Sequence, residues 1–586
     1  MYYYGTMNRS TTQITFRDEI KLKDKLDYKT VLDLILKSRN IKNIDEFLTP
    51  PSPLTLTLED FGPYKKSFEK VIKILKDIKE KNQMIVVYTD YDADGITGGA
   101  VLWETLHLLG FKVRPYVPDR KKEGYGYSNL GIDNCIEQFN PGLIITVDHG
   151  ITKIKEVEYA KSKKIRTIIT DHHLKGDASP KAEAIFHIPA LSGSGVAYFF
   201  AKEIFNSFSP VQTQNFASLQ KNFQTDYLAL TSIGTIADLV PLTGPSRSLV
   251  KYGLETFSKV KRFGIKHILK QAGIQDKKIT PYEVGFMIAP RINAIGRLEH
   301  AIDALRLLCT NDEKKAYDLA HKIGNVNVER QELVEKSVAE ARSSIGSDPR
   351  RGSDPIIILV SDHWHEGIIG LIASKIAEEF YRPTLVLTKT ETGYKGSARS
   401  IPSFHVTEFL RSLKKNIIDV GGHKQAAGFT LEKDQLSIFK MAAFKLANKL
   451  IKDKDLERKI EADLKIPISK INLDLVKSLE VLEPFGMGNS RPTFYSEGIL
   501  TGAQLLGKTQ KHLKIWVSDI TGKTGSVIPV KTGIQILELI SFNNAEKFKT
   551  LSRGQKIKVV YNLDINEWDN KKTVQGKVIF LESLND

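Results

Sequence analysis

Cysteine is scarce in this sequence: its 586 residues include only Cys135 and Cys309. The two lie far apart and in no spacing typical of metal ligands, which disfavours a thiolate metal site and predicts a reducing, cytoplasmic environment. Long apolar runs are missing too, since none approaches the ~18 residues that a membrane span needs. The first residues, MYYYGTMNRSTTQITFRDE, lack the apolar core of a signal peptide. We therefore expect a protein with no membrane partner.

Acidic residues are fewer than basic ones. The chain has 85 Lys and Arg against 69 Asp and Glu, which gives a formal net charge of +16 and a pI near 9.3. An excess of this size suits a polyanionic partner such as nucleic acid. A lysine-rich proteome would produce the same excess, and the many Lys, Ile and Asn residues also fit that explanation. Charge alone leaves both interpretations open.

Strand-like apolar runs alternate with helical patterns between about residues 81 and 240. This alternation predicts an α/β domain with a parallel sheet. A crossover helix is expected in HGITKIKEVEYAKSKK, residues 149–164. The strand candidates are QMIVVYTD (83–90), KVRPYVP (112–118), GLIITVD (142–148), IRTIITD (165–171) and AEAIFH (182–187).

The second half of the chain changes pattern twice. Residues 311–345 are charged and mostly helical, and a continuous helix there would span ~50 Å. GSDPRRGSDP (346–355) is interpreted as a linker, and a second α/β unit runs from there to about residue 455. The final part alternates apolar and polar residues, which predicts a small β-barrel or sandwich. Within it, Pro529 interrupts the stretch 525–540, which we interpret as an inserted loop.

The stretch DYDADG, Asp90 to Gly95, places three carboxylates at alternate positions before a glycine. An EF-hand calcium loop begins in this way, but it needs a bidentate Glu at its twelfth position, where this chain has Val101. The run before DYDADG has the pattern of a buried strand, and the run after it has the pattern of a helix. The carboxylates are therefore expected in the turn between a strand and a helix. They either cap that helix or bind a cation that offsets their mutual repulsion.

Three further stretches place similar side chains at the ends of apolar runs. LIITVDHG leads to Asp148, TIITDHH leads to His172 and His173, and LTSIGTIADLVPL carries Asp238. Functional residues of an open α/β sheet gather at the carboxyl ends of its strands. If all four motifs occupy strand ends, one rim of the sheet gathers Asp90, Asp92, Asp94, Asp148, His172 and Asp238.

Each of these residues also has a structural alternative. Asp148 and Asp171 could cap the helices that follow them, Asp238 could be hydrogen-bonded within a turn, and a single His is often structural. The recurrence of one placement at four motifs favours a metal site instead. Carboxylates with one or two imidazoles and no thiolate suit Mn²⁺ or Mg²⁺ better than zinc. Two such ions about 4 Å apart would serve the in-line hydrolysis of a phosphoester.

The motifs DYDADG, VDHG, TDHH and GTIADLVPL resemble, in order and spacing, the four motifs of the DHH phosphoesterase superfamily, and within it the RecJ family. The resemblance covers nearly the whole chain and includes GSGVAYFF, APRINAIGRL, GSARS, GGHKQAAG and LEPFGMGNSRPTF. It implies a multidomain α/β protein. A DHH parallel-sheet domain would be joined by a long helix to a DHHA1 α/β domain, with a C-terminal OB-like β-barrel.

The resemblance also implies roles for individual residues. Asp90 would assist catalysis and His173 would face the scissile phosphate. Two Mn²⁺ or Mg²⁺ ions would be held by Asp92, Asp94, Asp148, His172 and Asp238. At Tyr88 many members of the superfamily have His, which we interpret as altered metal preference at most. Ser397 and Arg399, with Arg120, would hold the 5′ end of the strand, and the further candidates for phosphate contact are Arg291, Arg297 and His423.

The predicted divisions are an N-terminal segment (1–80), the DHH domain (81–255), a helical connector (256–345), the DHHA1 domain (356–455) and the OB-like domain (456–586). OB-folds pair a basic groove with aromatic platforms for bases. Trp516, Tyr561 and Trp568 are available as platforms, although aromatic residues of a small barrel are as often part of its core.

The function implied by the resemblance is a metal-dependent exonuclease that hydrolyses single-stranded DNA from the 5′ end to 5′-mononucleotides, in repair and recombination. Single-stranded DNA is the expected partner, with a single-strand-binding protein and a RecQ-type helicase as candidate protein partners. One alternative is an oligoribonuclease or cyclic-dinucleotide phosphodiesterase of the same superfamily, but such proteins are typically shorter and lack the β-domain. The other is an inactive DNA-binding scaffold, against which the intact acidic residues argue.

Overall fold

The structure is a computed structural model, which describes residues 12–21, 27–208, 214–346, 354–520, 535–568 and 571–584. The chain divides into two compact units. The first, which we call the parallel-sheet unit, comprises Lys42–Arg330 and Leu482–Ser490. The second, the C-terminal unit, comprises Met1–Ile41, Gln331–Val481 and Arg491–Asp586. Across the described ranges, every helix is too short or too polar to cross a lipid bilayer.

A five-stranded, fully parallel sheet lies at the centre of the parallel-sheet unit, in the order β3-β2-β4-β5-β6. Its middle strands are runs of β-branched residues, and Ile85, Val86 and Val87 are all fully buried. Such runs are typical of strands that helices cover on both faces. All five predicted strands are present: β2 (Met84–Thr89), β3 (Val113–Tyr116), β4 (Pro141–Val147), β5 (Arg166–Asp171) and β6 (Ala184–His187).

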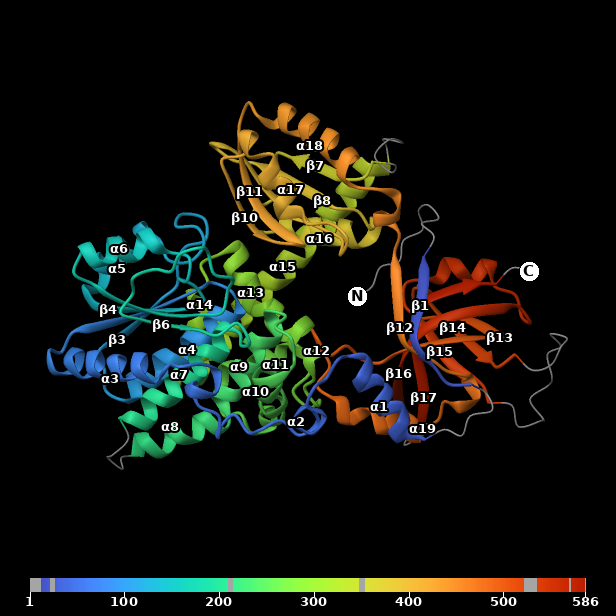
Figure 1. Cartoon of the computed structure of the whole chain (residues 1–586), viewed down its shortest axis with the longest axis horizontal. Coiled ribbons are helices and arrows are strands. Elements are labelled where there is room, and N and C mark those ends of the chain that lie inside the picture. The colour runs from blue at the N-terminus through green and yellow to red at the C-terminus, as the bar shows by residue number, and fades with distance from the viewer. Residues whose placement is uncertain are drawn as a thin grey trace. The chain divides into compact units, whose positions relative to one another are not determined.

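Helices cover both faces of this sheet (Figure 1). One face packs against α3 (Lys65–Glu80), α4 (Ala93–Leu108) and α7 (Gly193–Ser207), and the other against α5 (Asn129–Phe139) and α6 (Ile154–Ser162). Close packing of α4 depends on glycine, because a Cβ at Gly98 would lie 2.9 Å from Cα of Ser194. The DYDADG motif thus opens a helix that is wedged between the sheet and α7.

The predicted connector 256–345 is not a separate element. Its first helices bury their apolar faces in the same core as the sheet, because residues such as Ile265, Ile292 and Leu305 are almost fully buried there. Only α15 (Glu313–Gly346) continues beyond, as one unbroken helix, which confirms the predicted long helix. The connector also contains α11 (Phe263–Gln271), α12 (Pro281–Glu283), α13 (Ala289–Leu298) and α14 (Ile302–Cys309), and it is preceded by α8 (Gln214–Gln224), α9 (Asp226–Ala237) and α10 (Gly244–Thr256).

The stretch predicted as one N-terminal segment, residues 1–80, is divided between the units. Strand β1 (Gln13–Glu19) pairs in parallel with β12 (Lys459–Lys465), and Tyr28 at the start of α1 (Tyr28–Ser38) hydrogen-bonds to Asn472. Both contacts lie within the C-terminal unit. Helices α2 (Ile44–Leu48) and α3 belong instead to the parallel-sheet unit. Pairing between segments over four hundred residues apart leaves no local pattern from which it could be predicted.

The C-terminal unit contains the predicted second α/β unit. Its mixed sheet has the order β10-β11-β9-β8-β7, in which only β7 and β8 run parallel. The strands are β7 (Ile357–Ser361), β8 (Thr384–Lys389), β9 (Gly393–Arg399), β10 (Asp419–His423) and β11 (Ala426–Glu432), and the helices are α16 (Ile369–Phe380), α17 (Val406–Ser412) and α18 (Leu436–Leu450). Most of the predicted linker, residues 347–353, lies outside the described residues.

The predicted β-barrel is present and closed. Strands pair in the order β13-β14-β15-β17-β16, and β16 returns to pair with β13. Of the stretch interpreted as an inserted loop, 525–534 lies outside the described residues, whereas Leu537–Ser541 forms strand β15. Tyr561 is fully buried and its hydroxyl lies 2.7 Å from Ser496 Oγ, so it belongs to the core rather than to a platform. The barrel consists of β13 (Thr493–Leu506), β14 (His512–Ser518), β15, β16 (Lys556–Trp568) and β17 (Lys571–Ser583), preceded by α19 (Leu473–Ser478).

Candidate metal centre

Three of the four acidic motifs do lie at the carboxyl ends of parallel strands. Asp90 follows β2, Asp148 follows β4, and His172 follows β5. Asp238 departs from the prediction, because it caps the C-terminal end of helix α9 instead of ending a strand. The preceding apolar run is a helix surrounded by α4, α7 and α10, which explains why it is apolar on all sides.

The side chains of these motifs nevertheless meet. Within the described ranges, three sets have ligand atoms that all lie within 4.8 Å of one another. His172 and Asp148 each belong to two of the sets, so the sets adjoin. The sets are Asp148, His172 and His173; Asp94, His172 and Asp238; and Asp90, Asp92 and Asp148.

Three carboxylates surround a single nitrogen, Nε2 of His172. It lies 3.1 Å from Asp148 Oδ1, 3.4 Å from Asp238 Oδ2 and 3.9 Å from Asp94 Oδ2. The distance to Asp148 is short, yet neither Asp148 Oδ1 nor His172 Nε2 has a hydrogen bond of acceptable geometry to any described residue, and both are buried. Buried polar atoms without a partner are rare and point to a missing ion or water. The donor set therefore fits a divalent cation that prefers oxygen and imidazole ligands.

Backbone amides and glycines hold the carboxylates in place. Asp92 caps α4, accepting hydrogen bonds from the amides of Asp94 (3.0 Å) and Gly95 (3.1 Å). Asp94 accepts from the amides of Gly193 (2.6 Å) and Ser194 (3.0 Å) at the start of α7. A Cβ at Gly193 would overlap Asp148, and one at Gly234 would overlap Asp94. These two glycines let α7 and α9 approach the carboxylates, a role that the sequence patterns did not reveal.

Burial makes this cluster electrostatically costly without a cation. Removal from water raises the pKa of Asp90, Asp92 and Asp148 above the ordinary value, and the neighbouring carboxylates raise it further. The pKa of Asp238 is raised to about 8 for the same two reasons. A bound divalent ion would reverse this balance, because it stabilises the ionised form of each carboxylate.

His173 has a different environment from His172. Its Nδ1 lies 2.8 Å from Asp171 Oδ1 and its Nε2 lies 3.1 Å from the Tyr125 hydroxyl. Burial lowers the pKa of His173, but the bond to Asp171 and the nearby carboxylates outweigh it and raise the pKa to about 9. Asp171, considered from sequence only as a helix cap, orients His173 instead. Its position directly before two histidines was the available signal.

Tyr88 does not face the metal centre. It is fully buried among Tyr116, Tyr127 and His149 on the opposite face of the sheet, and its hydroxyl donates to the carbonyl of Gly126 (3.3 Å). Tyr88 therefore contributes to the packing of this side of the sheet.

The predicted substrate-binding residues fall in both units. Arg120 stacks over the ring of Tyr91 at 5.0 Å, Arg291 donates to the carbonyl of Met287 (2.5 Å), and Arg297 lies in the last turn of α13. In the C-terminal unit, Arg399 donates to Ser397 Oγ (3.1 Å) on strand β9, and His423 ends β10. The predicted substrate-binding residues of the parallel-sheet unit are Arg120, Arg291 and Arg297, and those of the C-terminal unit are Ser397, Arg399 and His423. Their roles remain predictions.

Comparison with known proteins identifies three domains. Residues 84–235 match the DHH family N-terminal domain, residues 353–453 the DHHA1 domain and residues 462–579 the RecJ OB domain. The single-stranded-DNA-specific exonuclease RecJ of Bacillus subtilis is 33% identical over 529 residues, which are 88% of this chain and 63% of the relative. The chain thus spans less than two thirds of that relative's length.

Solved structures agree with these matches. RecJ of Thermus thermophilus in complex with Mn²⁺ superposes with a TM-score of 0.77 at 26% identity, covering 99% of this chain and 81% of that one. A structure of exonuclease RecJ bound to manganese is 32% identical with a TM-score of 0.57, covering 68% of this chain and 100% of that one. With its three domains in order and the acidic motifs brought together at the sheet, the chain belongs to the RecJ family of DHH phosphoesterases.

Proposed function

We propose that this protein is a metal-dependent exonuclease that hydrolyses single-stranded DNA from the 5′ end to 5′-mononucleotides. The observation that carries the proposal is the convergence at the rim of the DHH sheet of two buried ligand atoms, Asp148 Oδ1 and His172 Nε2, that have no acceptable hydrogen bond to any described residue. The exonuclease activity named for the RecJ relatives supports the substrate. The polarity and a role in repair and recombination follow from the family alone.

In this proposal Asp92, Asp94, Asp148, His172 and Asp238 hold two Mn²⁺ or Mg²⁺ ions. When bound, such ions supply a nucleophilic hydroxide at neutral pH and stabilise the charge that develops on phosphorus. The chain itself supplies the fixed geometry. Asp94 is held by two backbone amides and Asp92 by its helix cap, so neither carboxylate needs to reorganise during the reaction.

His173 acts beside the ions. Burial lowers the pKa of His173, but the hydrogen bond to Asp171 and the surrounding carboxylates raise it to about 9, and the bond to Asp171 in particular favours the protonated imidazole. Nδ1–H donates to Asp171, which leaves Nε2–H to donate to a phosphate oxygen of the substrate in place of its contact with Tyr125. Asp90 would assist by adding negative charge next to the ions.

Recognition of the 5′ end is assigned to Ser397 and Arg399 with Arg120. A guanidinium fork and a hydroxyl suit a terminal phosphate, which distinguishes a strand end from an interior position. Further phosphate contacts are assigned to Arg291, Arg297 and His423. A cytoplasmic location, and a single-strand-binding protein and RecQ-type helicase as partners, are proposed from the family resemblance.

The test uses the full chain with Mn²⁺ and single strands labelled at either end, beside a duplex and a dinucleotide. We expect loss of the 5′ label as a mononucleotide, and little cleavage of the duplex. Release of the 3′ label first would refute the polarity. A preference for the dinucleotide would favour the oligoribonuclease-like alternative, and binding of DNA without cleavage would favour the inactive scaffold.

A further inference from the structure

The segment Leu482–Ser490 lies in the parallel-sheet unit, although the chain on both sides of it belongs to the C-terminal unit. We call these residues the return segment. The buried amide of Asn489 donates to the carbonyls of Leu482 (2.8 Å) and Pro484 (2.9 Å). Gly486 and Asn489 also exchange backbone hydrogen bonds of 2.9 and 3.2 Å. The return segment is therefore a closed turn with an internal polar core.

Arg247 of α10 anchors the return segment. Its side chain is fully buried, and Nη2 donates to the carbonyls of Leu482 (3.1 Å) and Glu483 (2.7 Å) while Nη1 donates to Pro484 (3.3 Å). Its Nε donates to the carbonyl of Phe47 (2.6 Å), whose ring lies 3.9 Å from the guanidinium carbon. One arginine thus joins the return segment, α10 and α2.

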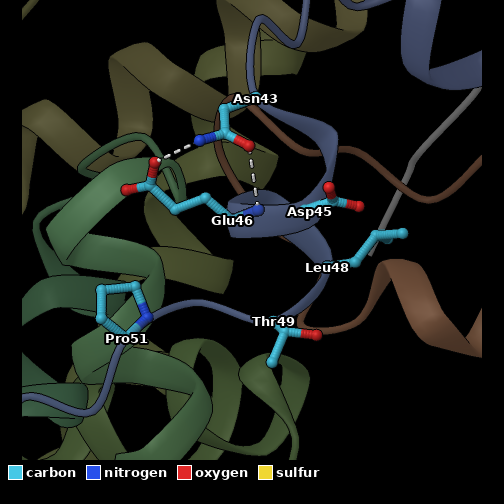
Figure 2. Close-up of a pocket in the computed structure, with 6 residues that line it drawn as sticks. All are labelled: Asn43, Asp45, Glu46, Leu48, Thr49 and Pro51. Atoms are coloured by element: carbon cyan, nitrogen blue, oxygen red, sulfur yellow. Dashed lines mark hydrogen bonds between the residues drawn. The ribbon is translucent and has the colours of Figure 1, made fainter.

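The acceptor at Phe47 is held by the capping of α2. Asn43 Oδ1 accepts from the amide of Glu46 (3.2 Å), and Asn43 Nδ2 donates to Glu46 Oε2 (2.9 Å), as drawn in Figure 2. The residues of α2 that line the pocket in this view include Asp45 and Glu46, and no basic side chain stands among the lining residues. That face does not suit DNA, so the contribution of α2 is the carbonyl and ring that it presents to Arg247.

The return segment also contacts the turn that follows Asp238. The amide of Leu242 donates to the carbonyl of Met487 at 2.7 Å, whereas Leu239 and Val240 reach back to α9 only through bonds of 3.3 and 3.4 Å. A Cβ at Gly488, whose φ is +71°, would lie 2.9 Å from Cβ of Pro241, and a Cβ at Gly486 would lie 2.6 Å from Cδ1 of Leu242. The return segment therefore stabilises the turn after α9, where the hydrogen bonds back to the helix are long.

We propose that the return segment is a positioning element for Asp238. By fixing Pro241 and Leu242, it limits how far Asp238 can move from its place 3.4 Å from His172 Nε2. The inference rests on the proposed function in so far as Asp238 is a metal ligand there. The return segment lies within the range that matches the RecJ OB domain, and strand β13 of the barrel begins just after it, at Thr493.

The test is the Mn²⁺ affinity of the full-length Gly488→Ala variant, measured by isothermal titration calorimetry without DNA. The added methyl group pushes against Pro241, and we expect Mn²⁺ binding to weaken about tenfold, as for other residues that orient a ligand. The matched control is Gly273→Ala. Gly273 has nearly the same φ (+67°), and no described atom lies within 4 Å of the added Cβ. The control should lose thermal stability through backbone strain alone and keep its Mn²⁺ affinity.

Two further variants separate contact from strain. Asn tolerates a left-handed backbone better than Ala but also has a Cβ, so Gly488→Asn should weaken Mn²⁺ binding as much as Gly488→Ala. Recovery of wild-type affinity in Gly488→Asn would overturn the inference. If the Gly488 variants do not fold, Gly486→Ala replaces them, because the contacts of its Cβ are with the side chain of Leu242 and not with backbone atoms. A smaller but measurable loss of affinity is expected, and an unchanged affinity would overturn the inference.

Failure of this inference can be distinguished from failure of the proposed function. A wild-type chain that binds Mn²⁺ but does not cleave single-stranded DNA would refute the activity and leave the comparison of variants valid. A wild-type chain that cleaves DNA, with return-segment variants that retain full Mn²⁺ affinity, would refute the positioning role alone. A wild-type chain that binds no Mn²⁺ would overturn both.

Discussion

Two buried polar sites of the parallel-sheet unit differ in whether their polar atoms have hydrogen-bond partners. At Arg247, the guanidinium donates to four backbone carbonyls that the fold supplies. At the metal centre, Asp148 Oδ1 and His172 Nε2 are buried without an acceptable hydrogen bond to any residue in the described ranges. The first site is completed by its own chain, and the second needs a cation. We infer that the buried charge of Arg247 stabilises the fold, whereas the buried carboxylates of the metal centre serve the chemistry.

The largest expected effect is at the metal centre. Asp148→Asn removes a carboxylate that belongs to two of the possible ligand sets. We expect nuclease activity to fall more than about 100-fold, beyond what the loss of a residue that only orients a ligand costs. The metal-free protein should be more stable than wild type, because repulsion with Asp92 and Asp94 is relieved. Initial rates and thermal melts in EDTA measure the two effects, and a less stable apo-protein would contradict this description.

Next in size is the loss of the Arg247 site. Arg247→Met leaves buried carbonyls without their donor, and we expect the free energy of unfolding to fall by about 3 kcal/mol or more. Urea titration measures the loss. The control is Arg306→Met, since Arg306 is exposed and pairs with Asp303 one helical turn away, an interaction worth less than about 1 kcal/mol. An equal loss of unfolding free energy in the two variants would show that the buried Arg247 contributes no more to stability than an exposed arginine.

A smaller effect is expected from Asp171→Asn. Asp171 touches His173 and raises its pKa, so the substitution should lower the pKa of His173 from about 9 towards the ordinary value. We expect the rate to fall about 10- to 100-fold and the alkaline limb of the pH–rate profile to move to lower pH. Mn²⁺ affinity should change little. A shift of metal affinity without a shift of the profile would show that Asp171 acts on the metal instead.

The smallest effect concerns pH and metal-free stability. The pKa of Asp238 is about 8 in the folded state against 3.8 ordinarily, mainly because of burial. Folding therefore favours the protonated form. The stability that this group contributes is fully present below its unfolded pKa of about 4 and is lost as pH rises through about 8.

The melting temperature in EDTA should accordingly fall by a few degrees between about pH 5 and pH 8. Mn²⁺ should restore it most strongly at the higher pH, because protons compete with the metal for the same carboxylates. A melting temperature in EDTA that is independent of pH would contradict the description of the cluster as self-repelling.

Much of the molecule was predictable because its signals are local. Buried parallel strands appear as β-branched runs, and a long charged helical pattern without breakers proved to be α15. The strand-end motifs likewise revealed Asp90, Asp148 and His172. Asp238 was predicted to follow a strand, but it follows helix α9. A helix that is buried on every side is an apolar run in the sequence, and so is a buried strand, so the two cannot be told apart by this pattern.

The parallel sheet, the long helix, the barrel and the acidic motifs at turns could be predicted from local patterns, because periodicity and turn chemistry act over a few residues. Which side chains meet became clear only from the folded chain. The position of Asp238 beside His172, the packing of Tyr88 against Tyr116 and Tyr127, and the return of Leu482–Ser490 to Arg247 all depend on contacts between distant segments. Such contacts depend on the close packing of helices and strands, which cannot be predicted from a local sequence pattern.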